Sequence, residues 1–159
     1  MRIILVAVLS VTMTAMTFAS QDSAAGAPLV ITISVGKQTV NVGDPVPVKI
    51  KVTNVSDHPL NLSGGLGNTG LASSHLFEIN GPAGRVLSRN ALRQGEPLTG
   101  DVVFRTLKPG ETFTEIEDVG RAYDMTKPGR YVIQLSRPIP DDREHRVVKS
   151  NKIAVTVTP

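Results

Sequence analysis

The chain has 159 residues, and its 17 lysines and arginines against 14 aspartates and glutamates give a formal net charge of +3. It contains no cysteine, which excludes disulfides and cysteine catalysis and, in an exported chain, favours a bacterial protein. Four phenylalanines, two tyrosines and no tryptophan offer too few aromatic rings to stack against bases, so no nucleic-acid partner is expected.

The first segment, residues 1–20, has the pattern of a signal peptide. Arg2 precedes an apolar run over residues 3–9, and small residues lead to an expected cleavage after Ala19 or Ser20. An uncleaved anchor is the alternative, but hydroxyl residues interrupt the run and it is short for a membrane span. We therefore expect a secreted or periplasmic protein that keeps no stable membrane span after cleavage, with residues 21–28 as a flexible tether.

Short segments of alternating polarity follow, and turn residues separate them. Val46, Val48, Ile50 and Val52 alternate with polar or exposed positions, which is typical of a strand with one face in the core and one in water. Residues 64–74 hold four glycines without periodicity and are expected to form a long loop. The expected strands are residues 29–35, 46–55, 60–62, 75–80, 85–87, 101–106, 112–117, 131–137 and 146–158. Residues 39–42 are expected to form a short strand or a bridge.

Two of the later segments need a specific explanation. Between residues 112 and 117 strict alternation fails, because Phe113 and Ile116 are three apart and Glu115 stands where a core residue is expected; a bulge or an edge strand would explain it. Residues 118–125 predict one short helical turn. A Pro-Gly turn then delivers Tyr131 to the start of a strand, as in the tyrosine corner of Greek-key sandwiches.

These elements predict an all-β fold over residues 29–159, an antiparallel immunoglobulin-like β-sandwich of about 7–9 strands. Three phrases carry a resemblance: N-V-G-D-P-V-P-V-K-I-K-V-T-N-V-S-D-H-P-L, L-K-P-G-E-T-F and R-A-Y-D-M-T-K-P-G-R-Y-V-I. Together they resemble the ancillary immunoglobulin-like domain that precedes the catalytic domain in deuterolysin-type, lysine-specific metallopeptidases. The resemblance covers residues 40–157, and a looser one points to the bacterial intracellular proteinase inhibitor domain.

Catalytic chemistry is not expected. Zinc peptidases need two histidines one helical turn apart with a glutamate between them, and the three histidines, at positions 58, 75 and 145, have no such spacing. Glu115 and Glu117 resemble paired carboxylates, but no feature predicts a pocket that would tune them. We therefore expect no enzyme, no metal and no cofactor. Two glycosylation sequons, at Asn54 and Asn61, are attributed to chance in a bacterial chain.

The expected function is that of a non-catalytic module that contacts another protein of the envelope or exterior, with a proteinaceous protease inhibitor as the alternative. The hairpin of residues 137–146 is the leading recognition element, and residues 64–74 or an edge strand are the competing surfaces. A bound cation or a purely solvated tip are other interpretations of the same hairpin. Scattered basic residues leave an anionic partner open, and the oligomeric state is also open. The candidate contact residues are Ile139, Asp141, Asp142, Arg143, Glu144 and His145.

Overall fold

The computed structural model describes residues 26–65, 76–88, 102–140 and 142–159. The expected signal peptide, residues 21–25 of the expected tether, and residues 66–75 and 89–101 lie outside this part. Strands dominate the described chain, which confirms the all-β expectation. No helix among the described residues is long and apolar enough to cross a membrane. The elements are β1 (Leu29–Val35), β2 (Thr39–Asn41), β3 (Pro47–Asn54), β4 (Leu60–Gly65), β5 (Leu76–Gly81), β6 (Gly84–Val86), β7 (Val102–Leu107), β8 (Thr112–Asp118), α1 (Val119–Ala122), β9 (Gly129–Pro138), β10 (Val147–Lys149) and β11 (Ile153–Thr158).

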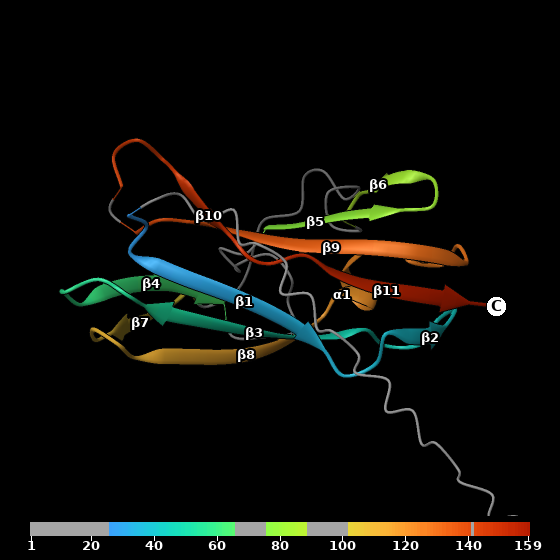
Figure 1. Ribbon diagram of the computed structural model, residues 1–159, viewed down its shortest axis with the longest axis horizontal. Coiled ribbons are helices and arrows are strands. Elements are labelled where there is room, and N and C mark those ends of the chain that lie inside the picture. The colour runs from blue at the N-terminus through green and yellow to red at the C-terminus, as the bar shows by residue number, and fades with distance from the viewer. Residues whose placement is uncertain (1–25, 66–75, 89–101, 141) are drawn as a thin grey trace, which may run out of the picture.

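Two principal sheets lie in two layers with the core between them (Figure 1). One has three strands in the order β1-β3-β8; the other has six, in the order β2-β11-β9-β5-β6 with β10 also paired to β9. A separate two-stranded ribbon joins β4 to β7. Every pairing is antiparallel except that of β2 with β11, which is parallel.

The alternation predicted for β3 is confirmed. Val48, Ile50 and Val52 are completely buried, whereas Lys49 and Lys51 are exposed. In β1 the inward-facing residues pair with those of β3, so that Ile33 lies opposite Ile50. Burial of these branched side chains from both strands holds the sheet against the opposite layer.

The strand expected over residues 112–117 is β8, and here only one of the two explanations holds. Its register with β3 runs without interruption from Thr112 to Asp118, so the predicted bulge is wrong. The edge position is confirmed, because β8 ends the three-stranded sheet in the described chain. Phe113 and Glu115 are half-buried on the inward face and Ile116 is exposed on the outward face. The alternation is therefore regular, and a carboxylate occupies a core-facing position.

The last expected strand, residues 146–158, is not continuous. It divides into β10 and β11, which both pair with the long strand β9. Between the pairs Lys149–Ser136 and Ile153–Ile133, the segment that links β10 to β11 has one more residue than the facing part of β9. The ladder is therefore interrupted as in a β-bulge. The Ser150 hydroxyl repairs part of the break by accepting the Leu135 N–H at 2.9 Å.

Asn151, within the same break, connects the two layers. Its side-chain oxygen accepts the Ile33 N–H at 2.8 Å, and its amide nitrogen donates to the Ile33 carbonyl at 3.0 Å. The side chain therefore replaces a neighbouring strand at one residue of β1. One further correction concerns Gly64 and Gly65, which belong to β4 rather than to the predicted loop.

Tyr131 makes the contact that its position predicts. It is 1% exposed, and its hydroxyl donates to the carbonyl oxygen of Lys127 at 2.7 Å. Gly81 of β5 lies against the ring: a Cβ at this position would be 2.6 Å from a ring carbon of Tyr131. Any side chain at position 81 would clash with the ring, so a glycine is required where β5 passes Tyr131.

Candidate functional site

The connection between β9 and β10 contains the predicted recognition residues, and the structure gives them different roles. It is the orange-red loop that projects at the upper left of Figure 1. Ile139 is 8% exposed and belongs to the hydrophobic core, and its N–H donates to the Arg146 carbonyl at 3.0 Å. Ile139 is thus an anchor of the loop, and its side chain is not free to meet a partner. Asp141 lies outside the described residues.

Asp142 holds the loop in shape. Its side chain is 8% exposed and accepts three hydrogen bonds from Arg146, from the backbone N–H at 2.7 Å, Nε at 3.1 Å and Nη2 at 3.0 Å. The hydrogen bond from the Arg146 side chain is the main reason that the pKa of Asp142 lies below its ordinary value. The carboxylate therefore stays ionised at neutral pH, and the pair closes the loop at its base.

Three consecutive side chains, those of Arg143, Glu144 and His145, remain exposed at the tip. Glu144 lies 3.3 Å from Arg146 Nε, and the His145 N–H donates to the Asp142 carbonyl at 3.1 Å. His145 has φ +54°, and in the described chain no other residue except glycine has a positive φ. This conformation is uncommon for a side chain with a Cβ, and it turns the chain back toward β10.

The tip does not have the arrangement of a metal site in the part of the chain that the structure describes. The Asp142 carboxylate is occupied by Arg146, and no three histidines or acids among the described residues come together to hold an ion. We use Arg143, Glu144 and His145, together called the tip triad, as the candidate site.

Glu115 and Glu117, which resemble paired carboxylates in the sequence, face the interior because they lie opposite the buried Ile50 and Val48. Across the core from Glu115, Arg137 of β9 is only 4% exposed. Burial lowers the pKa of Arg137, and the negative charge of Glu115 opposes that shift. Glu115 therefore supports a buried guanidinium. Sequence reasoning missed this partner, although Arg137 continues the inward phase of Tyr131, Ile133 and Leu135 and the alternation could have revealed it.

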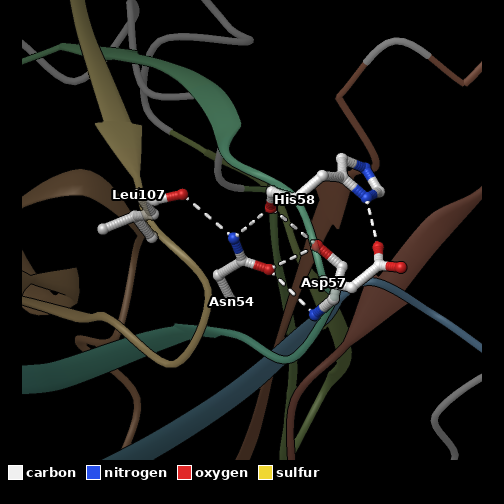
Figure 2. A network of polar contacts seen from close by, with 5 residues as sticks. Asn54, Asp57, His58 and Leu107 are labelled. Atoms are coloured by element: carbon white, nitrogen blue, oxygen red, sulfur yellow. Dashed lines mark hydrogen bonds and ion pairs between the residues drawn. The ribbon is translucent and has the colours of Figure 1, made fainter.

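The sequon at Asn54 is explained by structure. Asn54 is completely buried at the end of β3, and its amide nitrogen donates to the carbonyl oxygens of His58, at 2.8 Å, and Leu107, at 2.9 Å (Figure 2). Its side-chain oxygen accepts from the Ser56 N–H at 2.9 Å and the Ser56 hydroxyl at 2.7 Å. Asn54 therefore fastens the turn after β3 to the end of β7, and its nitrogen is not available to carry a glycan.

Comparison with known proteins adds little. No family model matches the chain, and the search of curated proteins found no match. Among solved structures, the chain is similar to the Beta-D-glucoside glucohydrolase from Trichoderma reesei, with a TM-score of 0.36 and 9% sequence identity. The alignment covers 91% of this chain and 20% of that chain, so this chain spans only a small part of that enzyme's length. A likeness of this size carries no argument about function.

Proposed function

We propose that the protein is an exported, non-catalytic module with an immunoglobulin-like β-sandwich, and that it binds another protein through the tip triad. One observation carries this proposal: the tip triad is exposed on a loop whose base is fixed by Asp142, Arg146 and the buried Ile139. A loop that is ordered before binding loses less conformational entropy when a partner arrives. Exposed loops on rigid strands are also where sandwich folds carry recognition.

The fold and the location rest on separate support. Two facing layers, mostly antiparallel pairing and the Tyr131 hydroxyl bonded to upstream backbone are features of immunoglobulin-like sandwiches. The charged, apolar and small-residue order of residues 1–20 supports export, and a secreted or periplasmic protein meets partners of the envelope or exterior.

A protease inhibitor remains the second candidate, favoured by the same geometry. A projecting loop that is held at both ends fits the concave cleft of a protease, and its rigidity would disfavour the rearrangement that cleavage requires. The chain's resemblance to an inhibitor domain supports the same reading. In this case the tip triad would enter the cleft of the protease.

The test changes only the exposed part of the loop. Replacement of all of residues 139–145 would remove Ile139 from the core and the Asp142 clamp, so a loss of binding could reflect unfolding. The variant Arg143→Ala/Glu144→Ala/His145→Gly keeps both anchors and relieves the positive φ. We expect it to melt near the wild-type temperature and to lose the proteins that the wild type captures and crosslinks from the source organism's envelope fraction.

Arg121→Ala, a change of an exposed arginine on α1, is the control and should retain those partners. A folded tip variant that keeps every partner would overturn the proposal. A panel of serine, cysteine and metalloproteases separates the two candidates: stoichiometric inhibition that the tip variant abolishes would establish the inhibitor.

A further inference from the structure

The outward face of the β1-β3-β8 sheet has an unusual chemistry. Register places its side chains in three rows across the strands. The residues of this lysine-hydroxyl face are Val30, Thr53 and Thr112 in the first row, Thr32, Lys51 and Thr114 in the second, and Ser34, Lys49 and Ile116 in the third.

The charges on the two sides of this sheet are segregated. Lys49 and Lys51 stand in the central strand of the lysine-hydroxyl face, and the same face carries five hydroxyl side chains and no carboxylate in the three rows. The acids of β8, Glu115 and Glu117, point inward. Asp118 lies beyond the rows, opposite Pro47, and its Oδ1 accepts the N–H groups of Val46 and Gly120. The face therefore presents positive charge that none of its own carboxylates balances.

The face is also open to solvent. Both lysines and most of the hydroxyl residues are exposed, and Ile116 is 67% exposed. The Thr53 and Thr112 hydroxyls bond each other at 2.9 Å, which orients one end of the face. Ammonium groups and hydroxyls are the donors that bind phosphate oxygens, and lysine acts there as a compact point charge.

Spacing selects the form of the phosphate ligand. Six backbone bonds separate the Cα atoms of alternate residues in a strand. Because an antiparallel strand rises about 3.4 Å per residue, the Cα atoms of Lys49 and Lys51 lie about 6.8 Å apart along β3. A linear glycerol-phosphate polymer also has six backbone bonds from one phosphorus to the next. Successive phosphates can meet the two lysines in register while the hydroxyls of β1 and β8 donate from either side. A nucleic-acid strand shares this spacing, but the lysine-hydroxyl face has no aromatic side chain on which bases could stack.

We propose that the lysine-hydroxyl face binds a linear glycerol-phosphate polymer, through one phosphate on Lys49 and the next on Lys51. This surface is separate from the tip triad and does not depend on the function proposed for it. Such contacts are electrostatic and release counterions, so binding must weaken with salt. For two phosphates on a flexible strand, the apparent affinity should fall about sevenfold between 50 and 200 mM NaCl.

The experiment measures binding of the full chain, without its signal peptide, to surface-immobilised poly(glycerol phosphate). Lys49→Ala/Lys51→Ala should reduce affinity by at least about tenfold, as expected for two lost ionic contacts. The control, Lys127→Ala/Lys152→Ala, removes the same charge from exposed sites outside this sheet. It should reduce the affinity for the polymer less than about twofold.

Each other outcome overturns the proposal. Absence of binding by the wild type at 50 mM NaCl would refute it, and equal losses in the two double variants would show attraction by net charge alone. Equal or stronger binding to single-stranded DNA, or to vesicles containing anionic phospholipid, would assign the face to a different ligand. The tip variant should bind the polymer as the wild type does, so failure here leaves the protein-binding test unaffected.

Discussion

β3 and β8 are neighbours in one sheet, yet their inward faces differ. Val48, Ile50 and Val52 of β3 are completely buried, whereas Phe113, Glu115 and Glu117 of β8 are half-buried. Both strands alternate regularly, but β3 has a strand on each side and β8 is paired only to β3 in the described chain. Alternation therefore identifies the face on which a side chain lies, and the position of the strand in the sheet decides which chemistry that face tolerates.

The same change made in both strands tests this comparison most strongly. Ile50→Ala removes a completely buried side chain and should lower the free energy of unfolding by about 4 kcal/mol, because it leaves a cavity. Ile116→Ala removes the same atoms from an exposed site and should change the free energy of unfolding by less than about 0.5 kcal/mol. Urea titrations of the two variants provide the measurement, and similar losses would show that the phase of β8 has been misassigned.

Asn54 ends the inward row of β3, and its removal should have the next largest effect. Asn54→Ala leaves the carbonyls of Leu107 and His58 without this donor and removes the acceptor for Ser56. Loss of buried hydrogen bonds predicts a decrease of about 3 kcal/mol in the free energy of unfolding. Asn61→Ala, on the exposed face of β4, is the matched control. Equal stability of both variants in thermal melts would refute the structural role of Asn54.

Glu115 tests whether the polar interior of β8 is supported by charge. Glu115→Ala takes away a negative charge that favours the buried Arg137 guanidinium, and we expect a loss of about 2 kcal/mol, moderated by the partial exposure of Glu115. In a double-mutant cycle, Glu115→Ala should cost clearly less when Arg137 is already methionine. Additive losses would mean that the two side chains do not interact.

The smallest effects should come from the outward residues of both strands. Lys51 and Thr114 lie opposite each other at solvent-exposed positions. Lys51→Ala and Thr114→Ala should each change the free energy of unfolding, measured by chemical denaturation, by less than about 0.5 kcal/mol. A loss above 1 kcal/mol at either position would indicate that the face is covered in solution, contrary to its exposure in the structure.

The elements that depend only on the local pattern of apolar, polar and turn residues could be predicted from the sequence. The strands around Ile50 and Tyr131 followed from alternation and turn residues, and so did the short helix after Asp118. The break at Ser150 was not predictable, because it follows from how two strands share β9 and not from any change of polarity. The burial of Ile139 was missed for a similar reason: a charged hairpin was treated as uniformly exposed, although one apolar residue at its base reaches the core.

The tip triad could be predicted only in outline. Its charged composition and the two prolines that precede the triad, Pro138 and Pro140, marked residues 137–146 as a candidate. The roles within the loop come from geometry. Asp142 and Glu144 are both acids near Arg146, and only the structure shows that the first is enclosed by the arginine while the second is left exposed. Sequence spacing carries no information on which of two similar side chains turns inward.

The parallel pairing of β2 with β11 has a mechanical consequence. Tension that enters β2 at its amino end and leaves β11 at Pro159 runs along the strands, since both point the same way. The bonds from Thr156 N–H to the Gln38 carbonyl, at 2.7 Å, and from Val42 N–H to the Thr158 carbonyl, at 2.8 Å, are then loaded in shear and must fail together. A pull along this axis must therefore break several hydrogen bonds at once, and it meets greater resistance than a pull that opens a ladder bond by bond.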